Sequence, residues 1–477
     1  MKRQQALVIR HDKMKNWLDT ELAGSTFKDE RLSARFKTIV ENLSRDGEES
    51  IPKVCEDWAA TKAAYRFLSN DRVDESDILE GHQQQTRKRI NACDGPVLIL
   101  HDTTEFSFKR KNEEAIGWTR KSPTLSSLVI GIPNERKYCG VLMHASLAVT
   151  PEGLPLGLIS TQFWSRKVFK DTDQMKRFIN PTRVPLSEKE SIKWLHSLEN
   201  VHGTGIKEPS QLIHIGDREN DIYEYFCECE RLNTHFIVRA CVNRLANEST
   251  LVEEIACHRR SFKHRIQFVQ SDGKMIKATL ELKYRRLVLH PSMGKQKAYP
   301  DLIVTVVSAV EIDAPANRKP ISWNFITNLP VDGKRNLIQV LEWYKQRWKV
   351  EIYFKVLKSG FRIEESKLRT ADRLSKLISI YCILAWRIQW ITWLKREHDK
   401  LKPDFVFNVI ERKLLKHYHK KPDEVETLND YILQLAKMGG YLARKNDPPP
   451  GIQIIWRGLS KLADLCLGFR LALDVGN

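Results

Sequence analysis

Residues 344–358 read YKQRWKVEIYFKVLK, and this stretch sets four functional side chains at spacings of three, four and seven. They are Tyr344, Arg347, Glu351 and Lys358. On one α-helix, which advances by about 100° per residue, all four would lie within roughly 60° of one another. The stretch therefore predicts a helix with a polar stripe in which a carboxylate stands between two cations and a phenol.

A carboxylate in this setting is suited to hold a divalent metal ion, and the Arg and Lys beside it are suited to neutralise phosphates. The alternative is a solvated amphipathic face held by pairs three and four residues apart. For this stretch taken alone, that alternative is the better interpretation. Two further carboxylates, each placed after an apolar run elsewhere in the chain, change the balance.

The first of these carboxylates is Asp102, which follows the short aliphatic run Val97–Leu100. Such a run, bounded by Gly and Pro, predicts a buried strand that delivers Asp102 to its end. The second is Asp217, which follows the apolar segment 212–215 and precedes an expected helix with an acidic first turn. Either Asp alone is equally explained as a cap or turn residue. Together with Glu351 they favour a metal site built from three separate elements.

The charge balance indicates what such a site would act on. The 477-residue chain has 78 Lys and Arg against 60 Asp and Glu, for a formal net charge of +18. This excess favours a polyanionic partner, and nucleic acid is the natural candidate. The basic residues are dense from 343 to 376, around Glu351. Charge alone speaks to partners and not to chemistry, so a merely adhesive basic protein is the alternative.

Other kinds of site and location receive little support. Nine scattered cysteines without a Cys-x-x-Cys pair indicate free thiols in a reducing compartment. No zinc-ligand spacing and no phosphate-loop motif occurs in the sequence. The opening residues are too charged for a signal peptide, and the apolar stretch 377–394 contains Arg387 and Gln389. We therefore expect a buried helix there, a cytoplasmic protein and no membrane partner.

The apolar pattern predicts an α/β fold with helical ends. The expected domains are a helical, basic region over 1–80, an α/β region over 81–240, a strand-rich region over 241–330, a region with the Glu351 helix over 331–395, and a helical region over 396–477. The first region is suited to a small DNA-reading module, with a helical cap on the main domain as the alternative. Helices are expected over 30–43, 57–68 and 187–198, and a hairpin is expected from 142–149 and 156–160.

Near the C-terminal end a set of apolar residues recurs at helical spacing. These residues are Leu459, Leu462, Ala463, Cys466, Phe469 and Leu473. Their spacing predicts a stripe that packs against another helix.

The sequence resembles the DDE-type bacterial cut-and-paste transposases of the insertion-sequence-four family over nearly its whole length. The most specific element is the family signature Tyr-x2-Arg-x3-Glu-x6-Lys, which is met from Tyr344 to Lys358. Residues 101–104, 188–194 and 217–221 also match. The combination is specific, whereas any one piece would be weak.

The resemblance implies an RNase H-like mixed sheet flanked by helices and interrupted by a mostly β insertion, with helical N-terminal and C-terminal domains. It implies the catalytic, metal-binding triad Asp102, Asp217 and Glu351, with two Mg²⁺ ions for which Mn²⁺ can substitute. It further implies that the protein cleaves transposon ends through a 3′-OH and a hairpin intermediate and transfers strands into target DNA. The expected partners are double-stranded end-repeat and target DNA and, because two ends are cut in concert, a second copy of the chain joined through the C-terminal stripe.

The DNA contacts of the family map onto single positions. They are Tyr344, Arg347 and Lys358 at phosphates near the cut, Trp323 at a flipped base, Arg239 at a DNA strand, Arg35 and Arg66 at the end-recognition positions, and Lys367 where a relative carries arginine. From the residues alone, Trp323 is better explained as a core residue of a strand, because aromatics are common there. Lysine at position 367 keeps the charge but loses bidentate geometry. The N-terminal match is otherwise looser, which implies that a different DNA sequence is recognised.

Two other functions stay open. An RNase H-like nuclease or resolvase would cleave DNA without strand transfer. A DNA-binding regulator that has lost catalysis would bind DNA without cleaving it. The signature over 344–358 argues against the first, and the intact Asp102, Asp217 and Glu351 argue against the second.

Overall fold

The computed structural model describes residues 17–47, 49–123, 135–168, 184–203, 205–258, 260–269, 275–316, 318–397, 401–418 and 422–475. Two compact units make up the chain. Unit 1 comprises residues 1–94, 103–170 and 350–477, and unit 2 comprises residues 95–102 and 171–349. Strand β1 (Val97–Ser107) begins in unit 2 and ends in unit 1.

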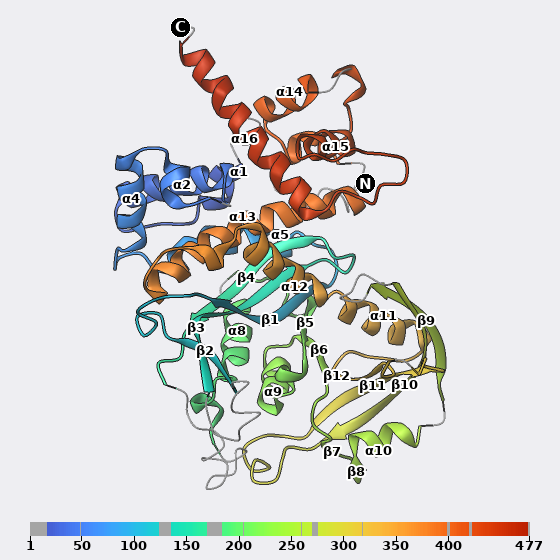
Figure 1. Ribbon diagram of the computed structural model, residues 1–477. Helices are drawn as coiled ribbons and strands as arrows, with labels where there is room; N and C mark the ends of the chain where they lie inside the picture. Colours follow the sequence, from blue (N-terminus) through green and yellow to red (C-terminus); the bar gives the residue numbers. More distant parts are fainter. Residues whose placement is uncertain are drawn as a thin grey trace. The chain divides into compact units, whose positions relative to one another are not determined.

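Unit 1 contains both helical ends of the chain and a group of antiparallel strands (Figure 1). Its elements are α1 (Trp17–Leu22), α2 (Glu30–Arg45), α3 (Ile51–Cys55), α4 (Trp58–Leu68), α5 (Glu75–Asn91), β2 (Trp118–Pro123), β3 (Glu135–Val149), β4 (Pro155–Trp164), α13 (Ala371–Glu397), α14 (Val409–His417), α15 (Leu428–Met438) and α16 (Ile452–Val475). Helix α12 (Trp348–Lys355) crosses from unit 2 into unit 1. Strand β3 pairs with β2 and β4, so the predicted hairpin is confirmed, with longer strands than expected.

The N-terminal helices form where their caps and apolar faces predict them. Asp29 caps α2 by accepting a hydrogen bond from Arg31 N at 2.9 Å, and Asp57 caps α4 through Ala60 N at 2.7 Å. The stacked rings of Phe36 and Phe67, with centroids 5.8 Å apart, join the buried faces of the two helices. The helices predicted over 30–43 and 57–68 are therefore confirmed.

Helix α13 passes through the core of unit 1. It is the one helix within the described ranges that is long and apolar enough to cross a membrane, and its apolar window is wholly buried. Arg387 and Gln389, which interrupt that window, are buried as well. The prediction of a buried helix over 377–394 is confirmed.

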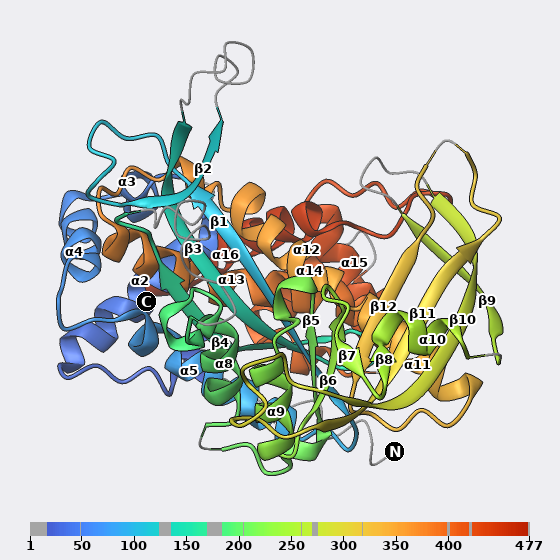
Figure 2. The ribbon, with the colours of Figure 1, turned by 90° about the horizontal axis from the view of Figure 1, so that it is seen from below.

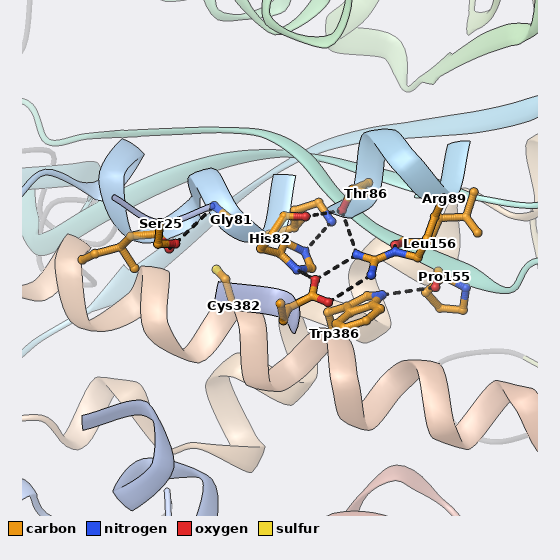
Figure 3. A network of polar contacts seen from close by, with 12 residues as sticks. Ser25, Gly81, His82, Thr86, Arg89, Pro155, Leu156, Cys382 and Trp386 are labelled. Atoms are coloured by element: carbon orange, nitrogen blue, oxygen red, sulfur yellow. Dashed lines mark hydrogen bonds and ion pairs between the residues drawn. The ribbon is translucent and has the colours of Figure 1, made fainter. Parts of the chain in front are cut away.

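A buried polar network joins α1, α5, β4 and α13 (Figure 3). Both oxygens of Glu21 accept hydrogen bonds from Arg89, at 2.9 and 3.0 Å, and Oε1 also lies 2.5 Å from His82 Nδ1. His82 Nε2 accepts from the Leu158 N–H at 2.9 Å, so the His82 ring is the neutral Nδ1–H tautomer. The Arg89 guanidinium lies over the Trp386 ring, 4.2 Å from its centroid. The network ties the N-terminal helix to the interior of unit 1.

Unit 2 is built on a mixed sheet with strand order β1–β5–β6–β12–β11–β10–β7–β8, and β9 pairs with β10. Its further elements are α8 (Ile192–Val201), β5 (Leu212–Gly216), α9 (Tyr223–Arg231), β6 (His235–Arg239), β7 (Leu245–Ala246), β8 (Ser249–Thr250), α10 (Leu251–Ala256), β9 (Phe262–Val269), β10 (Met275–Leu289), β11 (Leu302–Ile312), β12 (Ser322–Thr327) and α11 (Lys334–Lys345). Strands β1, β5 and β6 run parallel, whereas β6, β12, β11 and β10 are antiparallel (Figure 2). The strand-rich region expected over 241–330 is thus present.

The helix predicted over 187–198 begins later than expected. Residues Leu186–Glu188 form a 3₁₀ turn with no buried side chain, and α8 starts at Ile192. The first buried residue of α8 is Trp194, so the segment before it has no apolar face to hold a helix against the core. With this correction, the predicted α/β class with helical ends is confirmed.

Candidate active site and DNA-contacting residues

Asp102 and Asp217 belong to neighbouring parallel strands of unit 2. Val97–Leu100 of β1 pair with Leu212–Ile215 of β5, and each Asp stands two residues beyond its paired segment. Asp217 directly follows β5, as predicted. The prediction that a strand ends at Asp102 is wrong, because β1 continues to Ser107. Only the pairing with β5 stops there, and β1 has β3 as its neighbour on the other side.

Both carboxylates are partly exposed and already engaged. Asp102 Oδ2 lies 3.1 Å from Arg347 Nη1, and the two side chains are 18% and 20% exposed. Asp217 caps a 3₁₀ turn, where its Oδ1 accepts a hydrogen bond from Glu219 N at 2.9 Å. The alternative considered from the sequence, that Asp217 is a capping residue, is therefore confirmed. One backbone N–H uses only part of the accepting capacity of a carboxylate, so the cap does not exclude a metal ligand.

Cationic and phenolic side chains surround this pair within unit 2. Burial raises the pKa of the Tyr344 phenol, whereas the guanidinium groups of Arg347 and Arg239 oppose the rise and the Asp217 carboxylate adds to it. Burial lowers the pKa of Arg239. The positive charge of Arg347 lowers it further, whereas Tyr344 and Asp217 raise it. These mutual effects place Arg239, at the end of β6, in the same electrostatic neighbourhood as the signature residues. The arrangement offers two carboxylates beside two guanidinium groups.

The prediction of one continuous helix over 344–358 is wrong. Helix α11 ends at Lys345, a turn at residues 346–347 follows, and α12 begins at Trp348. After α12 the segment Val356–Gly360 is a π-helical turn that carries Lys358. Tyr344 therefore lies at the end of α11, Arg347 in the turn, and Glu351 and Lys358 on the helical run 348–360. Because of the turn and the π-helical part, the four side chains do not share one stripe.

Tertiary contacts explain why the helix breaks. The Tyr344 ring packs against Phe325 of β12, with centroids 4.4 Å apart, and its side chain is buried. Arg347 is held at Asp102. Both directions are set by the sheet of unit 2 and not by the local apolar period, so tertiary packing overrides it.

The described residues contain no group of three or more His, Cys, Asp or Glu side chains placed to hold a metal ion. Asp102 and Asp217 belong to unit 2, whereas Glu351 lies exposed in the first turn of α12, in unit 1. The shared role of the three carboxylates stays a prediction. Their chemistry fits the predicted ion, since hard oxygen ligands are what Mg²⁺ prefers.

Trp323 lies on β12, opposite Ala309 of β11, and is half-buried. Its ring centroid is 6.3 Å from that of Phe325, which is fully buried. Trp323 is therefore a strand residue at the margin of the core. This position is compatible with the packing role favoured from the sequence and leaves part of the ring accessible to a base.

Lys358 and Lys367 line one cavity of about 700 Å³ in unit 1. Other cations around it are Lys109, Arg110 and Arg362. Arg110 donates hydrogen bonds to the backbone carbonyls of Leu368, at 3.1 Å, and Ser366, which fixes the segment that carries Lys367. Glu49, Glu364 and Glu365 also line the cavity, so its five cations exceed its carboxylates by two. This excess of positive charge makes the recess suited to phosphates.

Arg35 and Arg66 lie on α2 and α4 of the N-terminal region. Arg66 is exposed, and so are Trp58, 77% accessible, and Tyr65 on the same helix. Neither aromatic was predicted as a functional residue from the sequence. The signal was available, because Trp58, Lys62, Tyr65 and Arg66 recur on one helical face, where exposed aromatics among cations indicate a nucleic-acid surface.

Helix α16 changes character along its length. Leu462 of the predicted stripe is buried, whereas Phe469 and Leu473 are exposed. The second half of the helix carries a run of accessible apolar side chains. These are Leu465, Leu467, Phe469, Leu471, Leu473 and Val475. Such an apolar surface at the end of a helix is typical of a protein–protein interface.

Three protein-family models match the chain. They are described as Transposase DNA-binding, over residues 14–73, Transposase DDE domain, over residues 208–387, and Transposase Tn5 dimerisation domain, over residues 383–476. The DNA-binding match covers Arg35 and Arg66, and the DDE match covers Asp217 and the whole 344–358 signature. The order of the three agrees with the resemblance drawn from the sequence.

The matches also account for the two surfaces described above. The exposed face of α4 falls within the DNA-binding match, and the apolar end of α16 falls within the dimerisation match. DNA and a second copy of the chain are thus the partners of this protein. The chain belongs to the DDE transposases related to the transposase of Tn5, as a DNA-acting enzyme with an RNase H-like catalytic domain between its DNA-binding and dimerisation regions.

Proposed function

We propose that this transposase binds the end repeats of a bacterial transposon as a homodimer, cleaves them through a 3′-OH and a hairpin, and joins them to target DNA by two-metal-ion phosphoryl transfer in the cytoplasm. The observation that carries the proposal is the pairing of β1 with β5. It brings Asp102 and Asp217 to neighbouring strands of one sheet, beside Arg347 and Arg239.

Asp102, Asp217 and Glu351 are the residues proposed to hold two Mg²⁺ ions, with Mn²⁺ as a substitute. Bound ions of this kind lower the pKa of an attacking water or hydroxyl and stabilise the departing oxygen. Carboxylates supply the hard oxygen ligands that such ions need. No side-chain nucleophile is required, so the protein's own contribution is to position the DNA and to neutralise its charge.

The cations of the site are proposed to hold the DNA. Arg347 presents a planar guanidinium that can grip a phosphate with two parallel hydrogen bonds, and Lys358 and Lys367 act as point charges in the recess of unit 1. Tyr344 and Arg239 complete the phosphate contacts of unit 2, and Trp323 stacks on a flipped base. These contacts position the scissile bond, whereas Arg35 and Arg66 read the end DNA.

The proposed reaction has four steps on DNA. Water attacks the scissile phosphorus, and the 3′ oxygen leaves as a hydroxyl. That 3′-OH then attacks the opposite strand, which closes a hairpin and releases the flanking DNA. Hydrolysis opens the hairpin and restores the 3′-OH. Finally the 3′-OH attacks a phosphodiester of the target and displaces one of its 3′ oxygens.

The variant Glu351→Ala tests the assignment of the third carboxylate. It is expected to bind end DNA like the parent protein but to lose nicking in Mg²⁺, measured on a labelled duplex that carries one end. The control is Glu248→Ala, since Glu248 is exposed in the turn between β7 and β8 and has no proposed role at the site. Nicking by Glu351→Ala at the parental rate would overturn the assignment. Cleavage by the parent without strand transfer would instead favour a nuclease or resolvase.

A further inference from the structure

Three histidines form a hydrogen-bonded chain in unit 2. His101 Nε2 lies 2.8 Å from His214 Nδ1, and His214 Nε2 lies 3.1 Å from His202 Nε2. The rings of His101 and His214 are nearly coplanar, with centroids 5.1 Å apart and planes 14° apart, as an in-plane hydrogen bond requires, and neither side chain is exposed to solvent. His202 stands at the end of α8 and is partly exposed. The hydrogen-bonded row of histidines therefore runs from the surface to the middle of the sheet.

The histidine chain and the two carboxylates occupy opposite faces of the sheet. Successive side chains of a strand point to opposite faces, so His101 points away from Asp102. By the same alternation His214 points away from Asp217, three residues later. The histidine face is covered by α8 and α9, whose Trp194 and Tyr225 rings lie 6.1 and 6.5 Å from His101. The two strands are thus cross-linked on the opposite face, next to Asp102 on β1 and three residues before Asp217 on β5.

The imidazoles are neutral inside this environment. Burial lowers the pKa of His101 to about 3 and that of His202 to about 4, and it also lowers the pKa of His214. A neutral imidazole has one donor and one acceptor nitrogen, so both hydrogen bonds must run in the same direction along the chain. A fully satisfied buried network of this kind holds its members in one arrangement.

The His101–His214 hydrogen bond lies close to the place where the backbone pairing of β1 with β5 ends. Backbone pairing of β1 with β5 ends at Leu100 and Ile215, one residue before His101 and two residues before the carboxylates. Beyond that level Gly216 still pairs with Val238 of β6, but the direct links between β1 and β5 have to come from side chains. The His101–His214 bond lies at this level, because His214 pairs in register with Ile99 and reaches along the strand to His101.

We propose that the His101–His214 hydrogen bond positions Asp102 and Asp217 for metal binding by fixing the separation of β1 and β5 beyond their paired segment. Both histidines are positioning residues, since they face away from the reacting groups. The inference rests on the proposed function of the two carboxylates. Residues hydrogen-bonded to metal ligands typically change metal affinity by about 10- to 100-fold when they are replaced. The lower end of that range is expected here, because the histidines act on the carboxylates through the backbone.

Three substitutions of His214 test its two hydrogen bonds, first one at a time and then together. The amide of asparagine reaches the place of Nδ1, so His214→Asn keeps the bond to His101 and loses that to His202. The amide of glutamine reaches the place of Nε2, so His214→Gln does the reverse. His214→Leu removes both bonds and keeps a buried side chain of similar size. Ile215→Val is the matched control for a small loss of packing in the same strand.

The measurement is the Mg²⁺ concentration that gives half-maximal nicking of end DNA. It is expected to rise about tenfold or more for His214→Leu and His214→Gln, and to stay near the parental value for His214→Asn and Ile215→Val. End-DNA binding without metal is expected to be unchanged in all four, and thermal melting records how far each is destabilised.

Equal Mg²⁺ dependence for the Asn and Gln variants would overturn the inference, even where His214→Leu fails to fold. The variant Asp217→Asn, assayed in parallel, separates this outcome from a failure of the proposed function. If Asp217→Asn nicks like the parent protein, the carboxylates are not the metal site. If it is inactive while the Gln variant has the parental Mg²⁺ dependence, only the histidine inference fails.

Discussion

The buried network of unit 1 and the candidate site of unit 2 both contain a carboxylate paired with an arginine, but the two pairs differ in their exposure to solvent and therefore in their roles. In the network, Glu21 and Arg89 are enclosed, and both Glu21 oxygens are bound to Arg89 (Figure 3). In the site, Asp102 and Arg347 form an ion pair that keeps about a fifth of each side chain accessible. An enclosed pair can only hold the fold together. An accessible pair can exchange its partner for a metal ion or a phosphate.

The largest expected effect is the loss of nicking activity on replacement of Asp217. Asp217→Asn is expected to lower the nicking rate by at least about 10³-fold, roughly 4 kcal/mol in the barrier, because an amide is a poor ligand for a divalent ion. Thermal stability should change little, since the amide oxygen still accepts the Glu219 N–H. A single-turnover nicking assay measures the loss.

Asp221 is the matched control for that variant. Its side chain is enclosed, accepts from the backbone N–H groups of Cys241 and Val242, and pairs with Arg244. Asp221→Asn should therefore lower the melting temperature and leave nicking per folded molecule nearly unchanged. If Asp221→Asn lost nicking and Asp217→Asn lost only thermal stability, the assignment of the enclosed carboxylate to stability and of the accessible one to catalysis would be wrong.

The enclosed network is expected to yield the next largest effect. Glu21→Ala leaves Arg89 buried without its counter-charge, which typically costs about 3–5 kcal/mol of folding free energy. Denaturant unfolding measures the change. The control Glu49→Ala removes an exposed pair with Lys53 and should leave the unfolding midpoint in place. Nicking per folded molecule near the parental value would show that the network serves stability alone.

Local patterns predicted the elements around these two regions better than the contacts inside them. The helices over 30–43 and 57–68 follow from a capping Asp and an apolar face, and both signals are local. The β5 strand and its terminal Asp217 follow from an apolar run. The 344–358 helix failed because Tyr344 and Arg347 take their directions from Phe325 and Asp102, which are remote in sequence.

The same limit explains what the sequence analysis missed. His101 and His214 are 113 residues apart, and Glu21 and Arg89 are 68 apart, so no periodicity connects the members of either pair. Only the fold brings them together. The two aspartates could be proposed as a pair because each ends an apolar run. Their shared metal site with Glu351, and the domain boundaries, stay predictions.

Acid should weaken the enclosed network within a defined range. Burial alone would raise the pKa of Glu21, but Arg89 and the His82 hydrogen bond outweigh it and lower the pKa to about 2. A lowered carboxylate pKa means stability that is complete above the ordinary value, near 4.5, and is lost as the pH falls toward 2. The loss is on the order of 3 kcal/mol. Unfolding measured across this range in the parent and in Glu21→Gln tests it, since the variant should lack this part of the pH dependence.

The smallest expected effect concerns the accessible pair and sharpens the contrast most directly. Arg347→Gln removes a positive charge 3.1 Å from Asp102, so the affinity of the DNA-free protein for Mn²⁺ should rise severalfold, by about 1 kcal/mol. Arg347→Lys keeps the charge, and its affinity should stay near that of the parent, although it loses the bidentate geometry for phosphate. Titration calorimetry on the three proteins measures the difference. An unchanged affinity in Arg347→Gln would mean that Arg347 does not compete for the carboxylate, and that the ion pair of unit 2 is as structural as that of Glu21 and Arg89.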